Sequence, residues 1–555
     1  MDPARPASRR SSAAFLALLG ENLIALSLVG VLLGQLFGGR TVEVWRDFVP
    51  PIGFAAVLGL LSSAWAGRRL QRGRDSSEPR VTALPLAPTR TVLVLFLTGI
   101  LGPVYLSVRD PASSTQAALL LTWEVGMAST FVYGLLELVS ALTWAPWVAG
   151  RLPRSASLAT LASLAVVAVA VGPSSIIFEQ PYISLPVLAV LLLTSISRLP
   201  QPLGIPPAWI GLGIGAMVGL ASGQTSLDTT DYGPVGFPIP QLTPLLTGLS
   251  WLWAHPAYLM ILGCIAAQGV AVNVAHIESA AAMGDLYSRR KMLLIPAFCN
   301  LVGGLCGSSL PCQFTLGYQA YKSWGSTSAY AQGSGLALAA ILSTGALRPI
   351  LHLVPEAAWA PLFMLVLLAV VSQNLKQIPS QESICIAVAM IPHIAGLLAT
   401  RVQSSLSPAL LDVTAAGAKR MILQPQEMAV GQQWVAGGAT VTSLLWAGIA
   451  VAIVRSWPGY ASAGLAAGCL LSALGFIHAT SLTFHFGALS AGYLALALVF
   501  RVAQVLEPPP VEIIPKSLSS ELLEDMDDSS LGGTLPSRLP PEEAGGAAGG
   551  GSAAT

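Results

Sequence analysis

The stretch QGVAVNVAHIESAAAMGD, residues 268–285, sets an acidic side chain inside a long apolar run. A carboxyl group in lipid costs about 2.5–3.5 kcal/mol, so such a residue is a functional candidate by default. Glu278 has small or acidic neighbours on its predicted helical face: Ala271, Ala275, Ala281, Ala282 and Asp285. This face leaves room for a ligand, or for a neighbouring helix that pairs with Glu278 only for packing. A buried carboxyl group can also bind a proton or accept a hydrogen bond from a ligand N–H group.

The composition is that of a protein dissolved in lipid. Of 555 residues, 54% are hydrophobic and only 10% are charged, and the mean hydropathy is +0.68. Soluble domains carry about 25% charged residues, so a soluble enzyme is excluded. The net charge of +1 provides no field that would attract nucleic acid. The six cysteines form no C-x-x-C pair, and we interpret them as small buried hydrophobes and not as metal ligands.

Apolar stretches of roughly 20 residues predict membrane helices. Fifteen stretches, some short or interrupted, lie within residues 13–505, and we expect 13 to 14 of them to span the membrane. The first runs from Ala13 to about Gly38, too long for a signal peptide, and is interpreted as a retained helix. The sequence thus predicts an all-α polytopic protein of the plasma (inner) membrane.

Basic clusters predict the orientation, because they favour the cytoplasmic side. Clusters lie before the first helix, after the second, at Arg289-Arg290-Lys291 and at Lys419-Arg420. Residues 1–12 are therefore expected to be cytoplasmic, whereas segment 223–246 lacks basic residues and fits an external loop. The tail, residues 506–555, is rich in Pro, Ser, Glu and Gly, and we expect it to be disordered and cytoplasmic.

Two segments are interrupted at matching places in the two halves. Gly102-Pro103 breaks the stretch 90–107, and Pro311 breaks NLVGGLCGSSLPCQFTLGYQAY, residues 300–321. Paired interruptions are typical of inverted-repeat transporters, whose substrate site lies between the broken helices. A half-helix that begins near Gln313 and Thr315 would direct backbone N–H groups at a ligand. The same glycines also fit plain helix packing.

Other polar residues in apolar stretches are further candidates. His276 lies two positions from Glu278 on a different face, and a core role or a ligand-site role fits it equally. Glu21 and Asn22 interrupt the first helix, and Glu124 and Glu137 lie in a later one. Each fits function, interfacial placement or interhelical hydrogen bonding. Arg109-Asp110 either caps a half-helix near the site or ends it at the membrane surface.

Several motifs resemble those of the nucleobase/ascorbate (xanthine/uracil/vitamin C) permeases, nearest the hypoxanthine–guanine–adenine branch. AHIESAAAMGD (275–285) is similar to the eighth-helix motif, with Glu278 at the base-binding acid and Ser279 at the following hydroxyl. GENLIALS (20–27) resembles the first-helix motif, and GILGPVYLSV (99–108) the pattern that precedes the first short strand. Further similar segments begin at residues 300, 354, 392 and 481: NLVGGLCGSS, VPEAAWAPLFMLVLLAVV, PHIAGLLA and SLTFHFGALSAGYLALALVF.

The resemblance implies about 14 transmembrane segments in seven plus seven inverted repeats, a core domain that moves against a gate domain, and two half-helices with short strands. It implies proton symport, with His276, Asp285, Glu21 and Glu124 as coupling or supporting residues, and a homodimer is one expectation. Proton-coupled members often have a second acid in the tenth segment, where this chain has Gln313 and Thr315.

The leading hypothesis is a secondary transporter of purine- or pyrimidine-type nucleobases. Glu278 would bind the ring N–H edge, and Gln313 and Thr315, with backbone N–H groups of the tenth half-helix, the carbonyl side. Ser279 is a further expected substrate-binding residue. An anion carrier of the sulfate/bicarbonate type is the alternative on the same fold, although the soluble regulatory domain usual in that family is lacking. A non-transporting membrane protein is a third possibility. No P-loop, H-E-x-x-H or G-x-S-x-G motif is present, so the sequence predicts neither an enzyme nor a cofactor.

Overall fold

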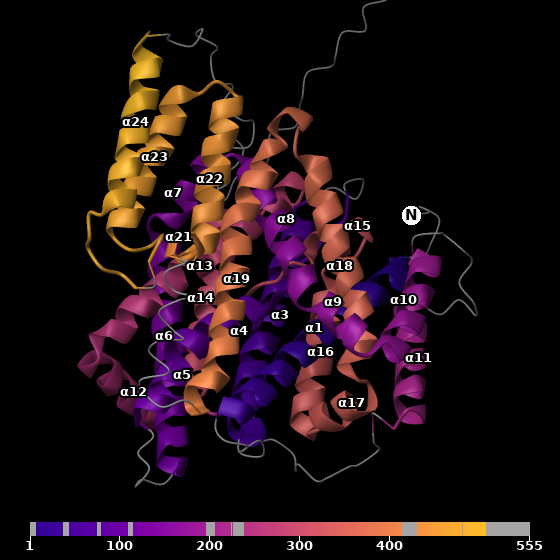
Figure 1. Cartoon of the computed structure of the whole chain (residues 1–555). Helices are drawn as coiled ribbons and strands as arrows, with labels where there is room; N and C mark the ends of the chain where they lie inside the picture. The colour runs from indigo at the N-terminus through magenta and orange to yellow at the C-terminus, as the bar shows by residue number, and fades with distance from the viewer. Residues whose placement is uncertain are drawn as a thin grey trace, which may run out of the picture. The chain divides into compact units, whose positions relative to one another are not determined.

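The computed structural model is an assembly of α-helices, as the sequence predicts (Figure 1). It describes residues 7–36, 44–74, 79–108, 115–195, 206–223, 225, 238–412, 430–479 and 481–506. The predictions for residues 1–6, Arg109-Asp110, Lys419-Arg420, most of the expected external loop and the tail from residue 507 lie outside these ranges. The chain divides into the compact unit Met1–Val511, described here, and the unit Glu512–Thr555, which lies outside the described residues.

The elements follow one another along the chain in this order. The helices of the first half are α1 (Ala7–Leu36), α3 (Val49–Arg72), α4 (Arg90–Phe96), α5 (Gly102–Val108), α6 (Thr115–Leu142), α7 (Ala145–Arg151), α8 (Arg154–Val171), α9 (Pro173–Glu179), α10 (Pro181–Ser195), α11 (Pro207–Ala221) and α12 (Leu242–Ala254). Those of the second half are α13 (Pro256–Ala282), α14 (Arg289–Leu305), α15 (Tyr318–Ser323), α16 (Ala329–Thr344), α17 (Leu347–Leu353), α18 (Glu356–Gln377), α19 (Ile384–Asp412), α21 (Val430–Ala436), α22 (Ala439–Val454), α23 (Pro458–Ala473) and α24 (Ala488–Leu506). The remaining elements are the π-turns η1 (Val44–Phe48) and η2 (Leu97–Leu101), the 3-10 turn η4 (Ser380–Glu382), and the strands β1 (Leu86–Ala87) and β2 (Gln313–Phe314).

Within the described ranges, nine helical stretches are long and apolar enough to cross a membrane, or ten if the bent pair α16–α17 is one span. Three shorter apolar helices lie at Pro181–Leu193, Pro207–Ala221 and Ala439–Val454. Large apolar side chains are exposed on several of them, such as Phe178 at 76% and Val505 at 71%. Such side chains are stable on the surface only against lipid, and helices satisfy their own backbone hydrogen bonds there. The chain is therefore an integral, all-α polytopic membrane protein.

The second interrupted segment meets an extended segment before α4 through two short strands. β1 and β2 pair antiparallel, with Leu86 opposite Phe314 and Ala87 opposite Gln313, and all four residues are buried. The N–H group of Thr315 extends the ladder by donating to the carbonyl oxygen of Pro85 at 2.9 Å. Non-helical backbone is tolerated at membrane depth because the surrounding protein covers it. The interruption predicted at Pro311 thus pairs, through β2, with an extended segment that precedes α4.

The first strand does not lie where the sequence motif placed it. β1 precedes α4, whereas GILGPVYLSV was expected to precede the strand. Pro85 and Pro88 flank β1, and proline favours extended backbone and lacks an N–H group for a helix. At Pro103 the chain stays helical, because the π-turn η2 ends at Leu101 and absorbs the missing hydrogen bond before α5 begins.

Small residues bring the helices of the largest core cluster together. α6 and α14 form the most extensive helix pair and lie side by side (Figure 1). A Cβ atom on Gly134 of α6 would lie 2.7 Å from the backbone nitrogen of Leu301, and one on Gly304 of α14 would lie 2.7 Å from that of Phe131. These glycines therefore permit direct backbone contact between the two helices.

A second group of helices, α8, α19 and α22, packs together with its own apolar cluster, which includes Ala156, Ala389 and Ala447. α18 packs against α8, but its buried apolar residues belong to the largest core cluster. α13 contacts both groups, because it packs against α6 and α14 and also against α8 and α22. The helix that carries Glu278 thus lies between two sets of helices.

Candidate functional site

The first polar cluster surrounds strand β2. Gln313 donates a hydrogen bond from its side-chain nitrogen to the hydroxyl of Tyr133 on α6. One turn further along α6, the buried Glu137 accepts hydrogen bonds from Asn273 of α13 at 2.9 Å and from Asn300 of α14 at 2.7 Å. Three helices and a strand therefore converge on one carboxyl group.

Both asparagines also hold the backbone of the second interrupted segment. The Oδ1 atom of Asn273 accepts from the N–H group of Phe314 at 3.1 Å. Asn300 accepts from the N–H group of Cys312 at 2.7 Å and donates to its carbonyl oxygen at 3.0 Å. The edge of the strand that faces these helices is thus satisfied by side chains, as buried backbone groups require.

A second cluster lies at the end of α13, around Ser279. Its hydroxyl accepts a hydrogen bond from the amide nitrogen of Gln319 on α15 at 2.6 Å and faces the Oδ1 atom of Asn374 on α18 at 3.4 Å. All three side chains are buried. Within the described part of the chain, the Oε1 atom of Gln319 and the Nδ2 atom of Asn374 have no hydrogen-bond partner.

Glu278 is buried and paired with arginines. Its Oε1 atom lies 2.6 Å from Nε of Arg289, at the start of α14, and its Oε2 atom lies 3.9 Å from Nε of Arg154, at the start of α8. The next residue, Ser155, contacts the carboxylate of Glu382, which also pairs with Arg455 at 2.6 Å. A row of alternating charges therefore runs from α14 past α13 and α8 to η4 and the end of α22.

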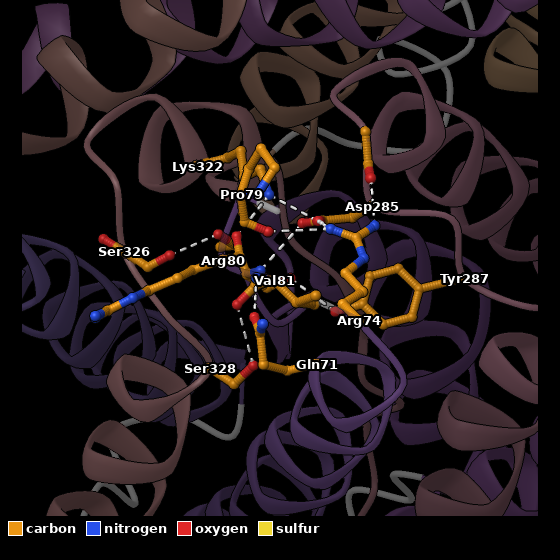
Figure 2. A network of polar contacts seen from close by, with 12 residues as sticks. Gln71, Arg74, Pro79, Arg80, Val81, Asp285, Tyr287, Lys322, Ser326 and Ser328 are labelled. Carbon is orange, nitrogen blue, oxygen red and sulfur yellow. Dashed lines mark hydrogen bonds and ion pairs between the residues drawn. The ribbon is translucent and has the colours of Figure 1, made fainter. Parts of the chain in front are cut away.

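Asp285 is the centre of a third network (Figure 2). Its carboxylate pairs with Lys322 at 2.7 Å and Arg74 at 3.4 Å. It also accepts hydrogen bonds from the hydroxyl of Tyr318 at 2.7 Å and from the backbone N–H group of Thr82 at 3.0 Å. The network joins the end of α3, the extended segment before β1, the α13–α14 connection and α15.

The basic cluster that follows the second predicted helix meets Lys322 in this network. Arg74 donates both to Asp285 and to the backbone oxygen of Gly284, just before α14 (Figure 2). Lys322 also donates to the backbone oxygen of Arg80 at 2.8 Å. Burial, with the nearby carboxylate of Asp285, raises the pKa of Tyr287, whose hydroxyl donates to the backbone oxygen of Thr82. The phenol is therefore a permanent hydrogen-bond donor here.

The other residues predicted from the sequence lie around these clusters. The Thr315 hydroxyl and both ring nitrogens of His276 are buried without hydrogen-bond partners in the described ranges. Glu21 lies close enough to Tyr321 and Tyr330 for its carboxyl group to interact electrostatically with their hydroxyl groups. Glu124 is half-buried near the start of α6, where α12 packs against its backbone.

The predicted set therefore divides between the clusters. Glu278 and Ser279 lie with Arg289, Gln319 and Asn374, whereas Gln313 belongs to the cluster around Glu137. The sequence marked Glu137 as an acid in an apolar stretch but did not place it in the site. It also missed Tyr133, Asn273, Asn300 and Asn374. The sequence does show each of them as a polar residue within or next to an apolar stretch, and an amide or hydroxyl group in a membrane helix needs a buried partner.

The chain resembles solved structures, whereas its sequence matches no known family model. No family model and no curated protein matches the sequence. Among solved structures, the chain is similar to the transmembrane domain of a cyanobacterium bicarbonate transporter, BicA, at 14% identity and a TM-score of 0.40, over 80% of this chain and 97% of that one. We therefore argue the function from this chain's own residues.

Proposed function

We propose that the protein is a secondary carrier for small polar solutes, with nucleobase-type molecules as its substrates. The observation that carries this proposal is the buried Ser279 cluster beside the first turn of α15. Its residues come from α13, α15 and α18, elements that meet next to the second interrupted segment. A membrane protein with only a packing role has little reason to place three polar side chains there.

The unused atoms of this cluster fit the edge of a nucleobase. Gln319 offers a free acceptor and Asn374 a free donor, on either side of the Ser279 hydroxyl. A pyrimidine or purine ring presents a neighbouring N–H donor and carbonyl acceptor, which would satisfy both. Because unpaired buried polar atoms cost about 1–3 kcal/mol each, a ligand that pairs them gains affinity and selectivity.

Glu278 supports the same site from the next position on α13. Its charge holds Arg289 of α14 and Arg154 of α8, and so links the two groups of helices. A carrier must change the contact between such groups during transport. We therefore assign Glu278 to substrate binding or to this contact, and expect Glu278→Gln to abolish uptake without lowering membrane expression. Unchanged uptake kinetics would refute the assignment.

One observation favours the alternative, an anion carrier. Two arginines face the single carboxylate of Glu278, and the Nη2 atom of Arg154 is buried without a hydrogen-bond partner in the described ranges. A planar anion such as bicarbonate or sulfate would suit this guanidinium. The surplus positive charge is partly exposed, since 39% of the Arg154 side chain is accessible.

Uptake by proteoliposomes separates these functions. The wild-type protein is tested with radiolabelled hypoxanthine, uracil, bicarbonate and sulfate. Ser279→Ala should lower nucleobase uptake at least tenfold, whereas Ser343→Ala, which removes a hydroxyl bonded only within α16, should not. Anion uptake that is lost in Arg154→Gln would favour the alternative. Absence of uptake for all four solutes would refute the carrier proposal for both classes.

A further inference from the structure

Glu137 is a buried acid whose charge has no cationic partner. Its side chain is 2% exposed. Among the described residues no ion pair involves it, in contrast to Glu278, Asp285 and Glu382, which all pair with basic groups. An unpaired buried charge is strongly disfavoured, so such a carboxyl group is readily neutralised by a proton.

The surrounding titratable groups leave this charge uncompensated. Those that act on Glu137 are Tyr133 of α6, Cys299 of α14 and Cys312 beside β2, which are neutral in their ordinary forms. α12 and η2, which also pack against α6, contain no charged residue. α5 also contains no charged residue. On α7, Arg151 is bonded to the backbone oxygen of Trp147, and at the start of α14 Arg289 is paired with Glu278 of α13. Arg290 and Lys291 lie in the first turn of α14, nine or more residues before Asn300. His276, one turn beyond Asn273 on α13, is buried without a partner in the described ranges.

The orientation of the two asparagines decides which ligand this site accepts. Backbone N–H groups of Phe314 and Cys312 require the Oδ1 atoms of Asn273 and Asn300 as acceptors. The Nδ2 atoms therefore face Glu137. A metal cation would need oxygen ligands, whereas here N–H donors surround the carboxyl group. The site consequently suits a proton and not Na⁺.

Tyr133 connects this carboxyl group to Gln313. Tyr133 lies one turn before Glu137 on α6, and its hydroxyl accepts a hydrogen bond from the amide nitrogen of Gln313. With Glu137 ionised, the hydroxyl hydrogen is therefore free to turn toward the carboxylate. With Glu137 protonated, the new O–H group donates to the Tyr133 oxygen, the Tyr133 hydrogen turns toward Gln313, and the amide must turn over to offer its oxygen. One O–H bond forms on Glu137 as the proton is added, and no other covalent bond is made or broken. The asparagine contacts persist, because a protonated carboxyl group keeps enough lone pairs for both.

We propose that Glu137 binds the proton that drives the carrier, and that Tyr133 passes its protonation state to Gln313. Gln313 lies on the strand of the second interrupted segment, so its amide presents a donor or an acceptor according to the state of Glu137. This inference rests on the proposed carrier function. It names the coupling site within that function, on α6, whereas Glu278 lies on α13.

Proteoliposomes with and without an inward proton gradient test the coupling. Glu137→Gln should still exchange labelled uracil or hypoxanthine but lose gradient-driven accumulation, at least tenfold. Glu179→Gln, which changes an exposed acid at the end of α9, should accumulate as the wild type does. Gly269→Ala tests the relay, because the atoms nearest to its Cβ atom would be the hydroxyl oxygen of Tyr133 at 1.7 Å and the amide nitrogen of Gln313 at 2.3 Å. It should lose accumulation too.

An infrared measurement tests the proton site without transport. The purified wild-type protein should show a protonated-carboxyl band that titrates with pH, is absent in Glu137→Gln and is kept in Glu179→Gln and Gly269→Ala. The inference is overturned if the band persists in Glu137→Gln, or if Glu124→Gln removes it or the accumulation instead. If the wild type exchanges no solute while the band is lost as expected, the carrier proposal fails and the proton site stands.

Discussion

Replacement of Asp285 by asparagine tests how the three-way junction of α3, α13–α14 and α15 is held. Asp285 is fully buried, and its partners Arg74 and Lys322 are each 11% exposed at the side chain. Removing one partner of a buried ion pair costs about 3–5 kcal/mol, because the remaining charge stays buried without compensation. In this variant both Arg74 and Lys322 lose the carboxylate, but each side chain is partly exposed and can be hydrated. We therefore expect Asp285→Asn to lower the free energy of unfolding by about 3–5 kcal/mol.

Reversible unfolding in mild detergent micelles, followed by tryptophan fluorescence, measures this change. Glu179→Gln is the matched control, because it removes an exposed carboxylate that makes no ion pair within the described residues and should stay within about 0.5 kcal/mol of wild type. Adding Lys322→Met to Asp285→Asn should recover part of the loss, since one stranded cation is removed. A loss below about 1 kcal/mol for Asp285→Asn would contradict the proposed role of the network.

Three further changes test other parts of the structure. Gly134→Ala should destabilise the protein by about 1–3 kcal/mol in the same assay, because the new methyl group meets the α14 backbone; Gly213→Ala, with open space around it, should not destabilise it. Asn300→Ala leaves Glu137 with the hydrogen bond from Asn273 but not the one from Asn300, and removes the side-chain partner of both backbone groups of Cys312. It should cost about 3 kcal/mol or more, and a neutral result would exclude the clamp on β2. Asn374→Leu should raise the KM for a transported nucleobase with little change in stability, and an unchanged KM would remove α18 from the binding site.

The sequence predicted the helical membrane class because that class depends on local composition. A run of about 20 apolar residues has few alternatives to a membrane helix, whatever the rest of the chain does. Pro311 marked the second interruption correctly, since the strand begins two residues later. In the first half, Pro85 and Pro88 flank the strand, whereas the interruption was predicted at Gly102-Pro103, where the chain is helical.

The polar clusters were harder to predict because they depend on contacts between distant segments. Glu137, Asn273 and Asn300 lie on three helices, and no spacing in the sequence connects them. Glu278 was recognised as a costly residue, but its partner Arg289 belongs to a basic cluster that was used only to assign orientation. A carboxylate in lipid can be compensated by an arginine or by neutral donors, and only the structure distinguishes Glu278 from Glu137 in this respect.

The pairing of β1 with β2 also imposes an order on biogenesis. Leu86 and Phe314 are more than two hundred residues apart, so at about 5–20 residues per second the ribosome needs roughly 10–50 s to supply the second strand. Until then the peptide groups around Leu86 have no strand to bond with, and hydrocarbon offers them no substitute. The nascent first half must therefore wait at the translocon or in a hydrated pocket, and this interval is when membrane quality control would recognise the chain.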